Sequence, residues 1–440
     1  MIESKLKYLY LIATVIIFCN QSFSQQKLSL TADQAVEIGL KNSKTLHSSL
    51  MKVKSAEAKV REINAGRLPS LTLSAAYRRL SSVEPFVIPF GNVIYTIPTS
   101  IADNYSTQLT VFQPLFTGFK LLSSIDMAEQ SAKATNEDYT KDESDLVFNV
   151  RNSYWTLYKA IEMKKVLDET VDQAKAHLND ARNLLKVGML TDNDILKLEV
   201  QLSDVLFKQT DADNAAQLSS VALNSVLSIP LDTQIEIASA PNVVTSNYTG
   251  LDKLVEVAFD KRPELKSADY RIKASEASVT AAQSSWYPQI SLIADYQYSR
   301  PNARIFPSVD EFKGTWDAGV NVSLNVWNWL TTAHQTDQAK AQLSQSIDAF
   351  GTIKDNITLE VTQDYLNFNQ AKKKIEISEL GQKQARENMR VTEEKFRSGM
   401  ALSSDVVDAE AALITAKVNY SNSVVDFELA KARLDKSIGK

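Results

Sequence analysis

The sequence predicts a mixed α and β fold in which each chain contributes four strands to a shared membrane β-barrel, continued by a long α-helical coiled-coil barrel. Three observations support this prediction. The chain is one unit repeated twice, each repeat holds two strands of alternating apolar and polar residues, and each contains a long stretch without proline. A period of two indicates a strand with two unlike faces, and an uninterrupted helix requires the absence of proline.

Residues 1–24 are predicted to be a secretory signal peptide. Lys5 and Lys7 form a basic start, an apolar run follows from Leu9 to Phe18, and small residues precede the cleavage site. The apolar run is shorter than the roughly 20 residues that a membrane-spanning helix needs. Cleavage would remove Cys19, the only cysteine, and with it any disulfide or thiolate metal site.

The composition argues against an enzyme and against a nucleic-acid partner. The net charge is −5, and the sequence has no basic cluster. The histidines His47, His177 and His334 lack metal-ligand or triad spacing, and we expect His177 and His334 to be solvated. Neither a Gly-x-Ser-x-Gly motif nor a phosphate loop occurs. We therefore predict no catalytic residues, no cofactor and no metal.

The two repeats are visible as a constant offset between similar residues. Pro69 and Pro288 lie 219 positions apart, and the same offset aligns the residues that follow them. Gly188 and Gly399 lie 211 positions apart. The difference of eight residues falls between the two strands of each repeat, so the first repeat has the longer loop there. Because each copy is far too long for a solenoid unit, we interpret the chain as a duplicated half-protein.

This division gives a first repeat at 25–230, a linker at 231–250 and a second repeat at 251–440. Each repeat opens with a predicted helical stretch, at 31–66 and at 251–285. Helix-start signals support both stretches, Thr31-Ala32-Asp33 in the first and Arg262-Pro263-Glu264 in the second.

Two strands follow in each repeat. The four predicted strands span about 69–80, 104–116, 288–299 and 315–327, where apolar and polar residues alternate. The same alternation fits a soluble sandwich, but aromatic residues at the segment ends favour the girdles of a membrane barrel. These aromatic residues are Trp286, Tyr287, Tyr296, Tyr298, Trp316 and Trp327. The loop from Ser81 to Asp103, which contains three prolines, is predicted to face the outside of the cell.

The third part of each repeat is predicted to be a helical hairpin of unusual length. Its helices are predicted at 119–186, 191–228, 332–397 and 402–438. At about 1.5 Å per residue, the longer ones extend roughly 100 Å. Gly188 and Gly399 mark the turns. The last helix carries heptads typical of a coiled coil. Its large column is Val406, Leu413, Tyr420, Phe427 and Leu434, and its small column is Leu402, Ala409, Ala416, Ser423 and Ala430.

Four strands are too few to close a membrane barrel. An unpaired strand edge has no water to satisfy its N–H and C=O groups inside a bilayer, and the smallest single-chain outer-membrane barrels have about eight strands. Several chains must therefore share one barrel, and this argument leaves two, three or four copies open. The polar strand faces would line a water-filled lumen, and the helices would continue that lumen away from the membrane.

With these features the chain resembles the TolC-family outer-membrane factors over nearly all of its mature length. The motifs that carry the resemblance are Lys261-Arg262-Pro263-Glu264-Leu265, Val187-Gly188-Met189 followed by Asp194, and Phe396-Arg397-Ser398-Gly399-Met400 followed by Asp405 and Asp408. The resemblance implies a homotrimer in the cell outer membrane that extends into the periplasm. It also implies a periplasmic adaptor and an inner-membrane pump of the RND or ABC type as partners, together with outer-membrane lipid.

The resemblance also assigns candidate site residues. It implies that carboxylates after the tips narrow the periplasmic entrance, and the matching residues are Asp405 and Asp408, with Asp194 at the equivalent position of the first repeat. A ring of carboxylates would favour cations, although Asp near a helix start is also ordinary dipole chemistry. It further implies that adaptors dock on the tip residues Val187, Gly188, Met189, Arg397, Ser398, Gly399 and Met400. The glycines could equally be plain helix ends.

The implied function is that of an outer-membrane exit duct of a tripartite efflux pump or a type I secretion system. The alternative is a periplasmic adaptor subunit, which also contains a coiled-coil hairpin. An adaptor carries one hairpin flanked by glycine-rich β-modules, whereas this sequence predicts two hairpins and strands with aromatic ends.

Overall fold

The computed structural model describes residues 27–81, 83–97, 101–241, 248 and 250–440. The predicted signal peptide and part of the predicted linker lie outside these residues. The chain forms two compact units. The helical unit comprises the described residues up to Ser48, Thr140–Arg262 and Asn356–Lys440, and the sheet unit comprises Ser49–Tyr139 and Pro263–Asp355. Each unit therefore takes segments from both repeats.

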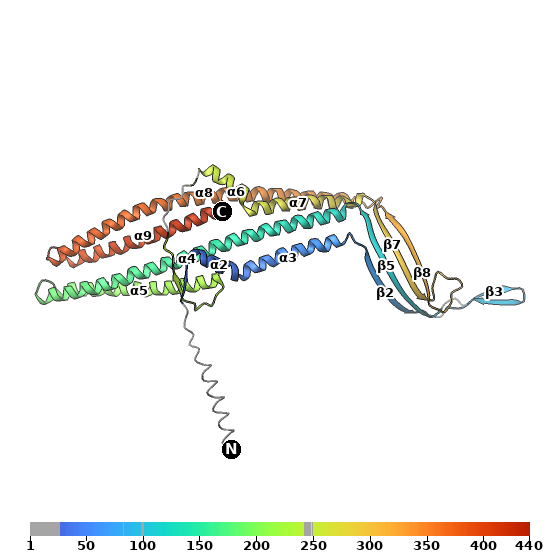
Figure 1. Cartoon of the computed structure of the whole chain (residues 1–440), viewed down its shortest axis with the longest axis horizontal. Coiled ribbons are helices and arrows are strands. Elements are labelled where there is room, and N and C mark those ends of the chain that lie inside the picture. The colour runs from blue at the N-terminus through green and yellow to red at the C-terminus, as the bar shows by residue number, and fades with distance from the viewer. Residues whose placement is uncertain (1–26, 82, 98–100, 242–247, 249) are drawn as a thin grey trace, which may run out of the picture. The chain divides into compact units, whose positions relative to one another are not determined.

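The helices of the two repeats match in order (Figure 1), and each pair agrees in length to within one residue. In the first repeat they are α2 (Ala32–Asn42), α3 (Lys44–Ala65), α4 (Lys120–Lys186) and α5 (Asp192–Leu227), and in the second α6 (Leu251–Lys261), α7 (Pro263–Gln283), α8 (Thr331–Arg397) and α9 (Ser403–Ser437). Both α4 and α8 have 67 residues, as the proline-free stretches predict. No helix in the described part of the chain is long and apolar enough to cross a membrane.

Both opening helical stretches are divided, which the sequence did not predict. Thr31 caps α2 through a capping box with Gln34, and the helix ends at Asn42. The next residue is Ser43, whose Oγ accepts a hydrogen bond from the Leu46 N–H at 3.1 Å. In the second repeat the division falls at Arg262, because Pro263 forces the preceding residue out of the helical conformation. A short 3-10 turn follows α7.

The four predicted strands form one antiparallel sheet in the order β2-β5-β7-β8. They are β2 (Ser70–Arg79), β5 (Asp103–Thr117), β7 (Gln289–Arg300) and β8 (Lys313–Ser323). The central β5–β7 pair joins the two repeats, and β2 and β8 are the edges. The fourth strand was predicted to reach 327 and ends at Ser323. The reason is that Ser323 pairs with Gln289, the first residue of β7, so 324–327 have no partner strand.

Two strand pairs were missed from the sequence. A parallel pair joins β1 (Leu28–Leu30) to β6 (Ile235–Ile237), and three residues are too few for a pattern. The predicted loop 81–103 contains a hairpin of β3 (Phe86–Phe90) and β4 (Val93–Ile97). Its turn is Gly91-Asn92, and Gly91 has a φ of +59°, which glycine adopts without strain.

A core in the helical unit holds α2, α4, α5 and α9 together. Its centre is the fully buried Tyr154 of α4, whose hydroxyl donates to the Leu30 carbonyl at 2.9 Å. The other buried residues of this cluster are Leu30, Ala35, Val150, Trp155, Leu157, Leu223, Leu227 and Val425.

Most of the predicted heptad positions on α9 face the interior. Val406, Leu413, Phe427 and Leu434 are buried. Leu402 was predicted in the small column, but it is 69% exposed because it precedes the first turn of α9. The expectation that His177 is solvated is also wrong. It lies on the packed face of α4.

Candidate functional site

The register of the sheet aligns residues of one kind across all four strands. One row consists of Leu71, Val111, Ala294 and Ala318, and the adjacent row consists of Thr72, Thr110, Asp295 and Asp317. Because successive residues of a strand point to opposite faces, the first row lies on an apolar face and the second on a polar face. The alternation in the sequence therefore produces a sheet with two unlike faces.

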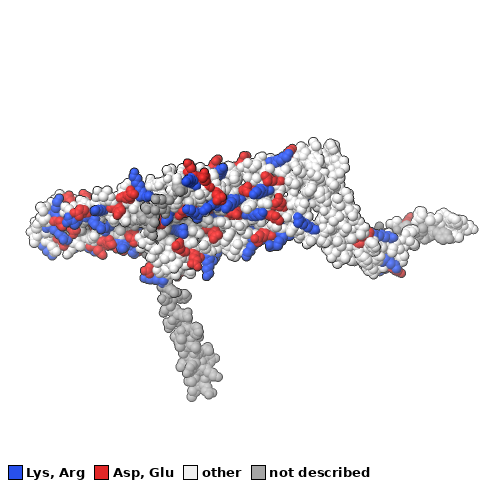
Figure 2. Space-filling view, turned by 45° about the horizontal axis from the view of Figure 1, so that its top comes forward, with Lys and Arg blue, Asp and Glu red and all other residues white. Residues whose placement is uncertain are grey.

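The apolar face of the sheet is uncovered in the single chain. Leu71 is 67% exposed, and the other exposed large residues of this face include Leu73, Tyr77, Tyr296, Trp316 and Val320. Figure 2 shows the visible surface of the sheet as a nearly uncharged band, whereas Lys, Arg, Asp and Glu are scattered over the helices. An exposed apolar surface of this extent marks contact with lipid or with another protein.

Hydrogen bonds between strands order the polar face. The Asp295 carboxylate on β7 accepts from Gln108 Nε2 at 2.8 Å and from Thr110 Oγ1 at 2.5 Å, and both donors lie on β5. Arg304, in the connection between β7 and β8, pairs with Asp317 of β8. The polar face thus presents hydroxyl, amide and carboxylate groups suited to contact with water.

The two hairpin tips have the same backbone design. Gly188 and Gly399 have φ values of +79° and +72°, the left-handed conformation that favours glycine. After α4, Met189 N donates to the Leu184 carbonyl at 3.0 Å. After α8, Met400 N donates to the Lys395 carbonyl at 2.8 Å. The same tight helix ending therefore occurs in both repeats, and it gives both glycines a structural role.

Asp194 and Asp405 cap the returning helices. The Asp194 carboxylate accepts from the Thr191 N–H at 3.1 Å and from its hydroxyl at 2.7 Å, and Asp405 accepts from the Leu402 N–H at 2.9 Å. The hydrogen bonds from Thr191 lower the pKa of Asp194 below its ordinary value. Asp408 lies one turn further along α9 and is exposed.

The two tips also contact each other. Ser403 Oγ, at the start of α9, donates to Asp194 Oδ1 at 3.1 Å, and the methyl carbon of Met189 lies 3.3 Å from the position that a Cβ on Gly399 would take. Close to these contacts, an apolar cluster contains residues of α4, α5, α8 and α9. They are Leu178, Ala181, Ile195, Leu198, Met389, Phe396, Val406, Ala409 and Leu413.

The predicted docking residues lie at the outer ends of the tips, where all seven are exposed. They are Val187, Gly188, Met189, Arg397, Ser398, Gly399 and Met400. Val187, Met189 and Met400 leave more than half of their surface uncovered, and so does Leu402, which the sequence analysis did not select. Arg397 pairs with Glu393 at 2.8 Å along α8. The tips thus present exposed apolar side chains on rigid helix ends.

Sequence reasoning missed Glu410, a carboxylate buried next to the tip cluster. The residue is 3% exposed, and its Oε1 has no hydrogen-bond partner among the residues that the structure describes. At the equivalent position of the first repeat, Glu199 pairs with Arg182 at 2.8 Å. In the second repeat the position equivalent to Arg182 holds Glu393, which explains why Glu410 lacks that partner. Burial raises the pKa of Glu410 to about 7.

We expect Glu410 to make the tips less stable as the pH rises. A carboxyl group with a raised folded pKa stabilises the fold at pH values below its unfolded pKa, and this stabilisation is lost as the pH rises through about 7. The loss amounts to about 3 kcal/mol. Glu410→Gln should flatten the dependence of the free energy of unfolding between pH 4.5 and 8. Glu199→Gln serves as the control. An unchanged profile in Glu410→Gln would contradict the assignment.

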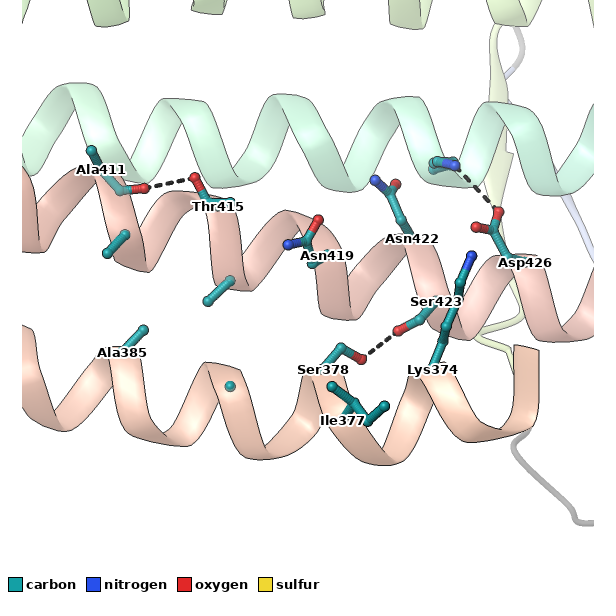
Figure 3. A pocket seen from close by; sticks show the side chains of 14 residues that line it. Lys374, Ile377, Ser378, Ala385, Ala411, Thr415, Asn419, Asn422, Ser423 and Asp426 are labelled. Carbon is teal, nitrogen blue, oxygen red and sulfur yellow. Dashed lines mark hydrogen bonds and ion pairs between the residues drawn. The ribbon is translucent and has the colours of Figure 1, made fainter. Parts of the chain in front are cut away.

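A groove of about 870 Å³ lies among α4, α8 and α9 in the helical unit (Figure 3). Small residues line much of it, namely Gly381, Ala385, Ala411, Ala412 and Ala416. Two pairs of its polar side chains interact. Lys159 lies 3.3 Å from Asp426, and the hydroxyls of Ser378 and Ser423 lie 2.6 Å apart. This lining suits the close approach of another helix better than catalysis.

Within the described residues, no group of three His, Cys, Asp or Glu side chains could hold a metal ion.

The family match to known proteins covers both repeats of the chain. A family model described as "outer membrane efflux protein" matches residues 36–228 and 254–440. The outer membrane protein TolC of Vibrio cholerae is 23% identical over 321 residues, which cover 72% of each chain. A probable efflux pump outer membrane protein, TtgC of Pseudomonas putida, is 20% identical over 417 residues, which cover 92% of this chain and 82% of that protein.

Solved structures confirm the predicted fold class. The CmeC outer membrane channel of Campylobacter jejuni aligns with a TM-score of 0.80 and 15% identity, covering 93% of this chain and 85% of that chain. The mixed α and β architecture built from two tandem repeats is therefore shared with known outer-membrane channels.

Proposed function

The chain belongs to the outer membrane efflux protein family, and from this premise we propose that three copies build the exit duct of a tripartite efflux pump or of a type I secretion system. It is an outer-membrane channel protein that extends into the periplasm. The observation that carries the proposal is the four-stranded sheet with an exposed apolar face, a polar face and two open edges. Nothing in the family match favours the alternative of a periplasmic adaptor.

The open edges of the sheet require other copies of the chain. In a bilayer, β2 and β8 would each leave a row of backbone groups unsatisfied. Pairing β2 of one copy with β8 of the next closes the sheet into a ring. Three copies of four strands give a twelve-stranded barrel, with the apolar face toward outer-membrane lipid and the polar face toward the lumen. Transport through such a duct is passive, and the chain needs no catalytic group.

The exposed hairpin tips support a docking role. Rigid helix ends with uncovered Val187, Met189 and Met400 suit contact with the helical tips of a periplasmic adaptor. The adaptor would connect the duct to an inner-membrane pump of the RND or ABC type, which supplies the energy that the duct itself lacks.

Asp405, Asp408 and Asp194 are proposed to narrow the entrance. Asp405 and Asp408 follow the second tip on α9, and Asp194 follows the first tip on α5. Three copies would bring these carboxylates around one axis, where they would attract cations. The capping bonds of Asp194 and Asp405 use part of each carboxylate and fix its direction.

Planar-bilayer recordings test both the pore and its entrance. The purified oligomer should conduct ions, and Asp405→Asn with Asp408→Asn should reduce its preference for cations by roughly half or more. Asparagine retains an acceptor for the cap, so the fold should persist. Asp252→Asn, which removes an acidic residue from the first turn of α6, is the matched control. Unchanged selectivity in the double variant would remove both residues from the site, and absence of conductance would refute the channel.

A further inference from the structure

The β3–β4 hairpin is an apolar surface that the single chain leaves uncovered. No charged residue lies between Glu84 and Asp103. The exposed apolar side chains of the hairpin are Phe86, Val87, Ile88, Phe90, Val93 and Ile94. An isolated two-stranded hairpin is only marginally stable in water. We therefore expect a hairpin with this composition to pack against a partner surface.

The position of the hairpin indicates where that partner lies. The hairpin connects β2 to β5, so it leaves the sheet beside the β2 edge. The connection between β7 and β8, residues 301–312, leaves the same end of the sheet beside the β8 edge. When β2 of one copy pairs with β8 of the next, this pairing forms a seam between the two copies. The two connections then become neighbours across the seam.

Side-chain hydrogen bonds anchor both ends of the β7–β8 connection, and an apolar residue lies at its surface. Asn302 Nδ2 donates to the Lys313 carbonyl at 3.0 Å, and Arg300 makes two hydrogen bonds to the Asp310 carboxylate at 2.7 and 2.9 Å. Between these anchors Phe306 is 89% exposed. An uncovered phenylalanine on an anchored loop is typical of a residue that contacts a partner.

We propose that the β3–β4 hairpin of each copy packs on the β7–β8 connection of the next copy, around Phe306, and latches the seam of the barrel. This inference rests on the shared barrel proposed above. Burial of Phe306 against the hairpin removes apolar surface on both sides from water. Lipid is the less suitable partner, because hydrocarbon cannot satisfy the backbone groups on the outer edges of a two-stranded hairpin.

A photo-crosslinker at the hairpin tests the contact in the full chain within outer membranes. Phe90→p-benzoylphenylalanine should join two chains on irradiation, and the crosslinked peptide should come from residues 301–312. The same probe at Leu73, on the apolar face of β2, is the control and should capture lipid. Lipid adducts or only intrachain products from position 90 would overturn the latch.

A second measurement separates the latch from the assembly itself. On gels of samples heated to a series of temperatures, Phe306→Ala should lower the temperature at which the oligomer dissociates by about 5 °C or more, whereas Ser308→Ala in the same loop should leave it unchanged. Equal dissociation temperatures would refute the latch while the oligomer, and with it the proposed duct, stands. Absence of any oligomer in the unaltered protein would refute the duct.

Discussion

A lysine in place of Leu71 should abolish outer-membrane assembly. Leu71 is 67% exposed and lies in a row with Val111, Ala294 and Ala318, all on the face proposed to contact lipid. A lysine or arginine near the middle of the lipid-facing side of a barrel costs about 2–4 kcal/mol. That cost shifts the folding equilibrium of each chain by roughly 30- to 1000-fold. We expect at least a tenfold loss, measured as heat-modifiable oligomer in outer-membrane fractions.

The neighbouring residue provides the matched control for this substitution. Thr72→Lys places the same charge on the same strand but on the polar face, in the row that contains Asp295 and Asp317. A lysine there can be hydrated and shares its face of the sheet with two carboxylates, so assembly should be retained. Equal yields from Leu71→Lys and Thr72→Lys would show that the two faces do not differ in environment.

The second large effect is expected at Arg262, between α6 and α7. Its guanidinium is buried, and Nη1 donates to Glu360 Oε2 at 2.5 Å and to the Ser437 carbonyl at 3.2 Å. Arg262 therefore ties α6 to α8 and to the end of α9. Nearby, burial together with the charge of Glu360 raises the pKa of Asp364 to about 6. The charges of Arg433 and Lys436 act on the pKa of Asp364 in the opposite direction, and Arg262 pairs with Glu360 itself.

Arg262→Met should lower the free energy of unfolding by about 2 kcal/mol, because the half-exposed Glu360 carboxylate and the Ser437 carbonyl lose this charged hydrogen-bond donor. Denaturant titration of the purified protein, followed by helical circular dichroism, would measure it. Arg271→Met removes an exposed pair with Asp138 and should cost less than about 1 kcal/mol. Adding Glu360→Gln to Arg262→Met should recover part of the loss. No recovery would show that packing, rather than charge, is what Arg262 contributes.

The long helices and the faces of the sheet were predictable because they depend on local patterns. Proline-free stretches with glycine at each turn gave the bounds of α4 and α8 to within one residue. Alternation with a period of two gave the four strands. It could not show that β8 ends opposite the first residue of β7.

Features that depend on packing were not predictable. Ser43 looks like an ordinary helical residue, and its cap becomes visible only once the chain direction changes. The burial of Glu410 and of His177 depends on how α4, α5, α8 and α9 pack. The hairpin β3–β4 was hidden by three prolines that suggested an irregular loop. At the candidate entrance, the capping role of Asp194 could be inferred from its spacing after Thr191. A ring of carboxylates requires several copies of the chain around one axis, so local sequence patterns do not reveal it.

The central claim is that neighbouring copies complete the wall that one chain cannot close. Native mass spectrometry of the protein extracted from outer membranes in mild detergent tests it most directly, because it counts the chains in each particle. The account predicts particles of three mature chains that conduct ions after transfer to a planar bilayer. A folded single chain that remains stable and conducts in lipid would contradict it.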